Sequence, residues 1–306
     1  MWQTVGLLLL VSVSIVVIHG ASLPSIDWTR VKRVEQLDHY WARLPAEFQA
    51  YRNVSGPATR ITNGLDASPG QFPYQALVLS EFGMLTVLCG GSVLTQNFIL
   101  TAAHCVMFDQ VNRATGGTAI LGALNRLELE PTQQRVRFAT SSINVHPSYT
   151  VSNYRFDVAV VRLNSALQFT PFVQPVRLPM PLDVRQFDGH IGTISGFGQM
   201  SDTSSAFATI LQYTVNTIMS NSACISRWGS LLIEAQNVCL SGDGGRAACT
   251  GDSGGPLTVQ ESGLTLQIGV TSFGSGDGCM RGVPTVYARI TFFMDWIRAN
   301  SDYGDS

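Results

Sequence analysis

The chain has 306 residues and a formal net charge of −2, with 45% hydrophobic and 13% charged residues. This length allows one large domain or two small ones with an ample core. The near-neutral charge gives no sign of the excess of basic residues that is typical of nucleic-acid-binding proteins, so no nucleic-acid partner is expected. Function must therefore lie in local motifs.

Residues 1–20 carry an apolar run from Val5 to Ile18, and no Lys or Arg precedes it. A run of about fourteen residues is short for a membrane span and is typical of a signal-peptide core. Small residues at Gly20 and Ala21 favour cleavage near that point. We expect a signal peptide and a secreted, extracellular protein without membrane contact; the alternative is a buried amino-terminal strand.

Residues 21–60 have the features of a propeptide. Their apolar side chains recur at roughly helical spacing until Pro45, at Val31, Val34, Leu37, Tyr40, Trp41 and Leu44. The segment is either an amphipathic helix docked on the rest of the protein or a marginal helix in a disposable piece. It holds the chain's one lysine, Lys32, and no cysteine, so nothing covalent would retain it after cleavage. Asn53 begins an N-glycosylation sequon.

From residue 61 on, short apolar runs alternate with turn residues, which is typical of an all-β fold. A proline-rich connector, Phe169–Pro181, divides this region into two halves. Thr291–Asn300 is predicted to be a helix, because its large apolar side chains share one stripe. The predicted strands are Tyr74–Leu79, Val87–Leu94, Phe98–Thr101, Val158–Leu163, Ile191–Gly196, Leu211–Ile218, Pro256–Val259, Leu266–Ser272 and Thr285–Ile290.

A small, glycine-rich stretch surrounds Ser253 and is the strongest chemical signal in the chain. Flanking glycines let the backbone turn sharply and let a substrate approach. A serine hydroxyl is a weak nucleophile, so it needs a base and a group that orients the base. The α/β-hydrolase elbow places its histidine after the serine, and no histidine follows Ser253 here. His104 and Asp157 remain as partners, whereas His146 and His190 lack catalytic context.

Three motifs occur in a defined order: T-A-A-H-C around His104, D-V-A-V from Asp157 and G-D-S-G-G-P around Ser253. In this order the chain resembles the chymotrypsin-like serine proteases from about Ile61 to Asn300. The resemblance implies two six-stranded antiparallel β-barrels, about 61–170 and 171–290, followed by a carboxy-terminal helix. It also implies that the three motif residues meet in the cleft between the barrels.

The resemblance assigns a role to each of these residues. His104 would be the general base, Asp157 would orient it, and Ser253 would be the nucleophile. The backbone N–H groups of Gly251 and Ser253 would form the oxyanion hole. Without catalysis, His104 would be an ordinary core or surface histidine, and Asp157 a solvent-facing residue at a strand end.

Activation and disulfides also follow from the resemblance. A trypsin-like protease would cut after Arg60, and the new amino group of Ile61 would bind Asp252; an ordinary strand start is the alternative. The sequence alone allows fifteen pairings of the six cysteines. The family implies Cys89–Cys105, Cys224–Cys239 and Cys249–Cys279.

The expected specificity pocket has Ala247 at its floor, six positions before the nucleophile. Trypsin-like members carry an aspartate there, so weak affinity for Lys or Arg is predicted. Thr285 would shorten the slot and Gly274 would leave one wall open. Ser272, Phe273 and Gly274 would pair with the substrate backbone as an edge strand. The result is a slot for medium-to-large apolar side chains, with Asp277 within possible reach of its rim.

The leading hypothesis is a secreted serine endopeptidase made as a zymogen, with chymotrypsin-like or elastase-like specificity and a digestive role. Ile61–Gly64 and Pro69–Tyr74 also resemble arthropod digestive proteases of the brachyurin type. A non-catalytic protease-like binding protein and a cascade protease are the alternatives. Expected partners are polypeptide substrates, a trypsin-like activating protease and protein protease inhibitors. We expect a monomer without cofactor or metal; Glu128 and Glu130 lie in the region of the family's calcium loop without matching its full pattern.

Overall fold

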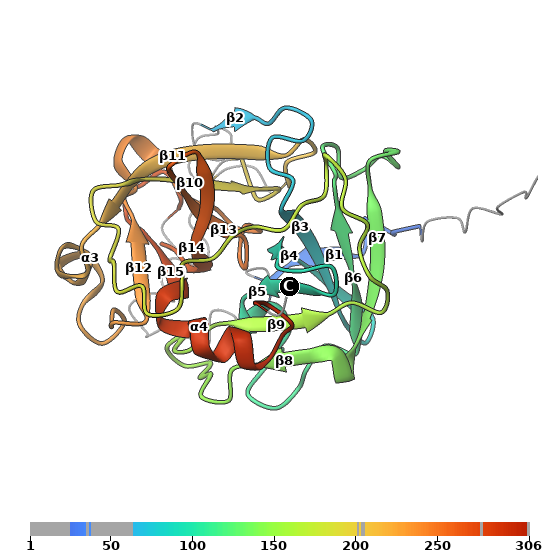
Figure 1. Ribbon diagram of the computed structural model, residues 1–306, viewed down its shortest axis with the longest axis horizontal. Helices are drawn as coiled ribbons and strands as arrows, with labels where there is room; N and C mark the ends of the chain where they lie inside the picture. Colours follow the sequence, from blue (N-terminus) through green and yellow to red (C-terminus); the bar gives the residue numbers. More distant parts are fainter. Residues whose placement is uncertain are drawn as a thin grey trace, which may run out of the picture.

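The computed structural model describes residues 25–34, 37, 64–200, 202, 206–275 and 278–304. The expected signal peptide, the sequon at Asn53, the cleavage point Arg60–Ile61 and the rim residue Asp277 lie outside the described residues. The described chain forms two β sheets that lie side by side, one from each half (Figure 1).

The first sheet has the strand order β7-β6-β3-β4-β5-β9-β8 and antiparallel pairing along that path. Long runs of β-branched and aliphatic residues fill its strands, and their side chains pack into the main core cluster. The bounds are β3 (Gln75–Phe82), β4 (Leu85–Val93), β5 (Phe98–Thr101), β6 (Gly116–Leu121), β7 (Gln134–Ala139), β8 (Ile143–Val145) and β9 (Ala159–Arg162).

The second sheet closes on itself, because β10 pairs with both β13 and β11 in the order β10-β13-β14-β15-β12-β11. The short strand β2, from the start of the first half, pairs with Gln212 and Tyr213 at the start of β11. The bounds are β2 (Leu65–Asp66), β10 (Ile191–Gly196), β11 (Gln212–Met219), β12 (Asn237–Leu240), β13 (Pro256–Glu261), β14 (Leu264–Phe273) and β15 (Thr285–Arg289). The all-β fold with a chymotrypsin-like arrangement is confirmed.

In the part of the chain that the structure describes, helices are few and short. The predicted carboxy-terminal helix is α4 (Ile290–Ala299), which packs against β14 and buries Phe293 and Ile297. A second helix, α3 (Asn221–Trp228), was not predicted; Ser220 caps it by accepting the N–H of Ala223. Single 3₁₀ turns cover Ala103–Cys105, Thr140–Ser142 and Asp243–Gly245. Among the described residues no helix is long and apolar enough to cross a membrane.

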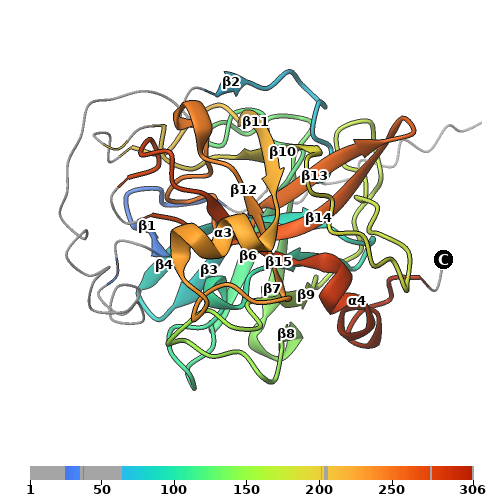
Figure 2. The same ribbon diagram turned by 90° about the vertical axis from the view of Figure 1, so that its left-hand side faces the viewer.

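The propeptide expectation needs a correction. Val31–Arg33 forms β1, a strand that pairs in parallel with β4, and is not part of a helix (Figures 1 and 2). Val31 begins the run of helical spacing, but the edge of β4 offers the backbone of Val31–Arg33 sheet partners, and Leu37 only donates its N–H to the carbonyl of Val34 in a turn. Sheet pairing is therefore preferred over an isolated helical turn.

All three disulfides form as the resemblance implied: Cys89–Cys105, Cys224–Cys239 and Cys249–Cys279. Each closes a loop of 15 to 30 residues, which restricts the unfolded chain by about 3 kcal/mol in the chain-entropy model. The first ties β4 to the turn that carries His104. The third ties the stretch before Ser253 to the loop that precedes β15.

Candidate active site

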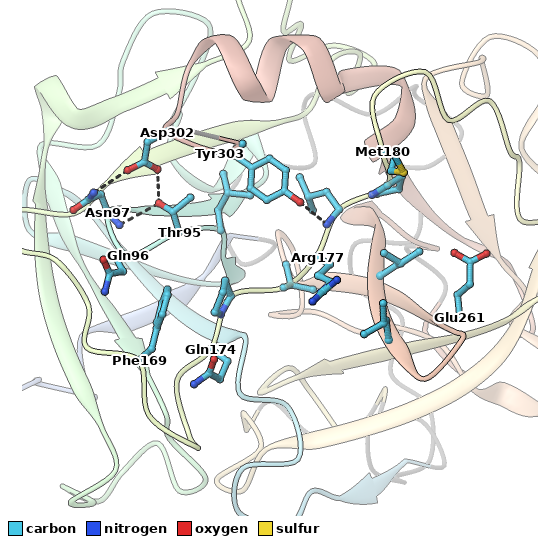
Figure 3. Close-up of a pocket in the computed structure, with 18 of the residues that line it drawn as sticks. Thr95, Gln96, Asn97, Phe169, Gln174, Arg177, Met180, Glu261, Asp302 and Tyr303 are labelled. Atoms are coloured by element: carbon cyan, nitrogen blue, oxygen red, sulfur yellow. Dashed lines mark hydrogen bonds between the residues drawn. The ribbon is translucent and has the colours of Figure 1, made fainter. Parts of the chain in front are cut away.

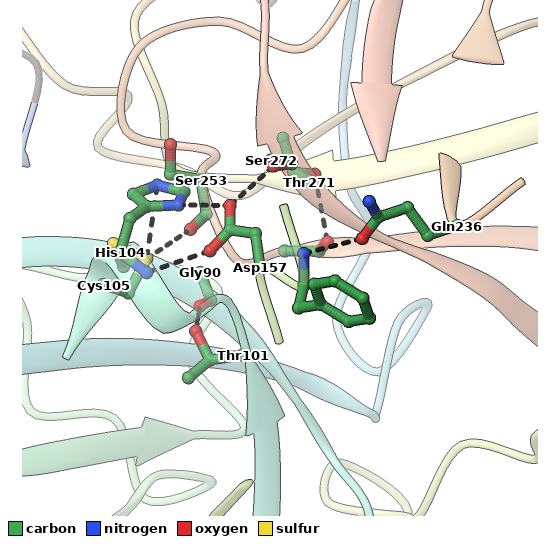
Figure 4. Close-up of polar contacts among 12 residues, drawn as sticks. Gly90, Thr101, His104, Cys105, Asp157, Gln236, Ser253, Thr271 and Ser272 are labelled. Atoms are coloured by element: carbon green, nitrogen blue, oxygen red, sulfur yellow. Dashed lines mark hydrogen bonds and ion pairs between the residues drawn. A yellow bond between two sulfur atoms is a disulfide. The ribbon is translucent and has the colours of Figure 1, made fainter. Parts of the chain in front are cut away.

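His104 and Asp157 form a buried pair. Nδ1 of His104 lies 2.8 Å from Oδ2 of Asp157, and the backbone N–H of His104 donates to Oδ1 at 3.0 Å (Figure 4). Both residues are only 1% exposed. A carboxylate that contacts Nδ1 favours the tautomer whose Nε2 can accept a proton. The pair is therefore oriented for general-base chemistry.

Ser253 lies on a tight loop whose backbone is fixed on both sides. Gly90 donates its N–H to the carbonyl of Ser253 at 2.7 Å, and Gly254 donates to the carbonyl of Thr271 at 2.8 Å. Gly254 has a φ of +80°, and a Cβ there would lie 2.3 Å from Oγ1 of Thr101. Gly251 has a φ of +97°. Both positions therefore require glycine, and the loop cannot relax without losing this turn.

The serine and the histidine are brought together by the Cys89–Cys105 disulfide. The Sγ atom of Cys105 lies 3.9 Å from Nε2 of His104 and 3.4 Å from the carbonyl oxygen of Ser253. Figure 4 shows the Ser253 side chain beside the imidazole. The structure thus gathers His104, Asp157 and Ser253, which are far apart in sequence, at one point between the two sheets.

Ser272 contributes in a way that the sequence did not predict. It was expected to pair with substrate backbone, but its hydroxyl donates to Oδ2 of Asp157 at 2.5 Å. Asp157 therefore accepts from Ser272 and from the backbone of His104, in addition to its contact with the imidazole. These donors stabilise the ionised carboxylate in a buried place.

Asp252 is buried beside the serine with 3% exposure. Its carboxylate accepts the N–H of Gly198 at 2.8 Å and that of Cys249 at 2.9 Å. A Cβ at Gly196 or Gly198 would lie 2.2 to 2.6 Å from this carboxylate, so both positions must be glycine. Burial, and next the charge of Asp252, raise the pKa of Tyr287, so that phenol stays neutral.

The expected pocket residues come from neighbouring strands. The register of β14 and β15 places Phe273 opposite Val286, next to Thr285. Ala247 and Thr285 are each 2% exposed, and a Cβ at Gly274 would meet nothing within 4 Å. Trp228 of α3, which the sequence analysis missed, packs edge-on against Phe273 with ring centroids 5.3 Å apart. Trp228 lies outside the three motifs, so no local sequence pattern predicted its contact with Phe273.

The loop that ends in Asp157 is clamped by the second half of the molecule. Phe156 has a φ of +54° and donates its N–H to Oε1 of Gln236 at 2.6 Å. Gln236 in turn donates to Glu234 at 2.8 Å, and Glu234 pairs with Arg155. A left-handed backbone at a bulky residue is costly, so these contacts hold a strained turn in place. No local sequence pattern predicted this clamp.

Replacing Gln236 by Leu should lower turnover while leaving substrate affinity nearly unchanged. The change leaves the partly buried N–H of Phe156 without its acceptor, which costs about 1 kcal/mol and lets Asp157 shift. We expect kcat to fall about tenfold and the pH profile of kcat/KM to move. Gln260→Leu, the same change at an exposed position, is the control. An increase in KM with unchanged kcat would argue against this positioning role.

Other polar clusters do not add a second site of this kind. Among the described residues, the two groups with metal-like spacing are Cys89–His104–Cys105 and Asp202–Cys249–Cys279, and each contains a disulfide-bonded pair. The carboxylate of Glu130 accepts from the backbone of Leu124 and Asn125 and from the Gln133 amide, so it orders its own loop.

A large groove lies away from these residues. It has a volume of about 1050 Å³ and lies between the connector, the β13–β14 hairpin and the carboxy-terminal residues (Figure 3). Asp302 accepts from Thr95 and Asn97 there, and the Tyr303 hydroxyl accepts the N–H of Leu178. These contacts anchor the end of the chain, and none of the predicted site residues lines the groove.

An imidazole–carboxylate pair beside a glycine-flanked serine, between two β-sheet halves, is the arrangement of a serine-type hydrolase. Residues 61–297 match the family model described as Trypsin. The collagenase of Hypoderma lineatum is 35% identical over 244 residues, which cover 79% of this chain and 87% of that protein. Brachyurin of Leptuca pugilator is 34% identical over 244 residues, covering 79% and 98%.

A solved structure of HL collagenase matches with a TM-score of 0.69 at 35% identity, covering 78% of this chain and 97% of that one. The chain therefore belongs to the trypsin family. It is a serine-type endopeptidase with a chymotrypsin-like fold.

Proposed function

We propose that the protein is a secreted digestive endopeptidase, made as a zymogen with residues 1–20 as signal peptide and 21–60 as propeptide. Cleavage after Arg60 activates it, and the active enzyme cuts after medium-to-large apolar residues. The observation that carries the proposal is the buried His104–Asp157 pair beside Ser253. The similarity to a collagenase and to brachyurin supports broad digestion of protein.

Catalysis begins when His104 takes the proton of the Ser253 hydroxyl through Nε2. The serine oxygen attacks the peptide carbonyl, and the N–H groups of Gly251 and Ser253 stabilise the oxyanion. His104 then gives its proton to the leaving amine, which departs and leaves an acyl-enzyme. Water, deprotonated by His104, hydrolyses the ester and restores the serine. Asp157 stabilises the imidazolium during both acylation and deacylation, and it stays ionised throughout.

Specificity follows from the lining of the proposed pocket. Ala247 supplies no carboxylate for a substrate cation, and Thr285 places a branched side chain beside Phe273. Burying a cation without a partner is strongly unfavourable. The open space at Gly274 leaves room for an apolar side chain to enter.

Peptides with Leu, Met, Phe or Tyr before the cut bond should therefore be cleaved at least about tenfold faster than those with Lys or Arg. Thr285→Gly should shift the preference toward Phe and Tyr, because it removes the branched side chain. Cleavage-site profiling on a mixed peptide library measures both effects. A strong preference for Arg in the wild-type profile would contradict the role given to Ala247.

A fluorophosphonate probe tests the proposed function directly. After trypsin cleavage, the wild-type protein should be labelled at Ser253 and should hydrolyse apolar peptides, whereas the intact precursor should react much more slowly. Failure of correctly cleaved protein to react would favour a protease-like binding protein. Cleavage restricted to sites after Arg would instead favour a cascade protease.

A further inference from the structure

Residues that precede the proposed cleavage point are docked on the first sheet. In β1, Val31 lies opposite Thr86, Lys32 opposite Val87 and Arg33 opposite Leu88, and both strands run in the same direction. Both views show β1 alongside β4 (Figures 1 and 2). A segment expected to be disposable is therefore part of the sheet.

This part of β4 is an open edge. Among the described residues, β3 pairs along one side of the strand, while β5 on the other side reaches only Ser92 and Val93. In the described part of the chain, β1 is the strand that pairs with the stretch 86–88 on that side. Unpaired strand edges bind extended peptides through their N–H and C=O groups.

Side chains fix the segment on this edge. Val34 is 2% exposed within the main core cluster, and Ile26, Trp28 and Val31 pack against a second cluster that includes Leu88. Asp27 accepts from the backbone and hydroxyl of Thr29, which shapes the turn around Trp28. These buried side chains indicate that the segment is docked on the sheet and is not a free tail.

Trp28 also connects the segment to the oxyanion loop. The guanidinium carbon of Arg126 lies 4.8 Å from the centroid of the Trp28 ring and 5.3 Å from that of Phe207. Phe207 in turn lies within 3.0 Å of where a Cβ at Gly251 would be. Arg126 is thus between two aromatic rings, one from the propeptide and one beside the loop that carries Ser253.

The docked strand ends next to the catalytic groups. Leu88 is followed by Cys89, whose disulfide partner adjoins His104, and by Gly90, which donates to Ser253. In the full chain the side chain of His104 is 0% exposed and Ser253 is 5% exposed. Both residues are therefore nearly inaccessible to solvent in this structure.

We propose that the β4 edge at Thr86–Leu88 is a peptide-binding surface for the chain's own residues 25–37. The segment stays bound there without a covalent link after cleavage behind Arg60, and it inhibits the enzyme reversibly until it dissociates. The inhibitory part rests on the proposed function, whereas the binding part does not. Lys32 then remains with the activated enzyme until release.

The binding test uses a fluorescein-labelled peptide of residues 25–37 and the precursor with Ser253→Ala, which prevents self-digestion. A second precursor adds Trp28→Ala and Val34→Asp, which free the edge. Fluorescence anisotropy should show saturable binding to the second precursor and at least about tenfold weaker binding to the first, whose own segment occupies the edge. Circular dichroism and thermal unfolding confirm that both precursors fold.

Matched peptides sharpen this test. Val34→Asp in the peptide should weaken binding at least about tenfold, because Val34 is buried. Lys32→Ala should leave binding unchanged, because that side chain is exposed and the backbone makes the pairing. Equal binding of a scrambled peptide, or no saturable binding to the freed edge, would overturn the proposal.

The inhibition test uses wild-type precursor cleaved by immobilised trypsin. The propeptide should co-elute with the enzyme on gel filtration, and activity should rise on dilution and fall again when the 25–37 peptide is added. Binding without any catalytic activity would mean that the proposed function fails while the docking surface stands. Full activity with no inhibition by saturating peptide would overturn the proposal alone.

Discussion

Ser253→Ala and His104→Ala should each lower kcat/KM by at least about 10⁴-fold, and the double variant should lose little more. In the proposed mechanism the two residues act as one unit, since Nε2 of His104 takes the proton that Ser253 gives up. Removing either one leaves only the oxyanion hole and substrate binding. The measurement is hydrolysis of an apolar peptide by trypsin-activated protein.

Two exposed positions give matched controls: Ser226→Ala and His190→Ala make the same chemical changes outside the site. Both controls should keep wild-type activity within about twofold, as expected for exposed positions. A Ser253→Ala protein that retains more than a few per cent of activity would refute the nucleophile assignment. Strictly additive losses in the double variant would indicate that the two residues act separately.

Asp252→Ala should abolish turnover while the three catalytic side chains remain intact. The change removes the acceptor of the Gly198 and Cys249 N–H groups and leaves a space between Gly196 and Gly198. Each buried N–H left without an acceptor costs about 1–3 kcal/mol, so the loop before Ser253 should rearrange. Activity should fall at least about 10²-fold, as when an oxyanion donor is lost.

The amino group of Ile61 gives a second measurement of the same prediction. We propose that after cleavage it pairs with Asp252, which raises its pKa above the unfolded value of about 7.7–8.0. The pair's contribution is then fully present below the unfolded pKa and is lost as pH rises through the raised folded value. Activity should therefore decline reversibly in alkali.

Reductive methylation near neutral pH should leave Ile61 unlabelled in the active wild-type enzyme and label it in Asp252→Ala. Asp243→Ala, at an exposed position nearby in sequence, is the control and should behave as wild type. The one lysine, Lys32, precedes the cleavage point, so label on any retained propeptide is separated by mass. Rapid labelling of Ile61 in fully active enzyme would contradict the pairing.

The sequence predicted most of the strands, because their apolar runs are continuous and bounded by turn residues. It missed β6, β7, β8 and β12. β6 begins at Gly116 and Gly117, and Gly117 is there because a Cβ would overlap the Phe138 ring. Glycines weaken any strand pattern. It also missed α3, where only Cys224 and Trp228 are buried and the helical periodicity is faint.

The sequence predicted those residues of the candidate site that lie within motifs. His104, Asp157 and Ser253 each carry a local signature, and the structure brings them together as expected. Ser272 and Gln236 act through single hydrogen bonds to residues 115 and 80 positions away. No local pattern encodes such a pairing. β1 was mistaken for a helix for the same reason, since its partner edge exists only in the folded protein.

The turn that carries Asp157 belongs to the first half of the chain, yet its backbone is held by Gln236 and its carboxylate by Ser272, both from the second half. Neither half alone therefore supplies all the contacts that hold the Asp157 carboxylate in place. A hybrid protease that joins the first half of this chain to the second half of a relative would be slow even if it folded, unless the relative supplied both contacts. Recombination within the family is consequently limited by these two hydrogen bonds as well as by the fit of the sheets.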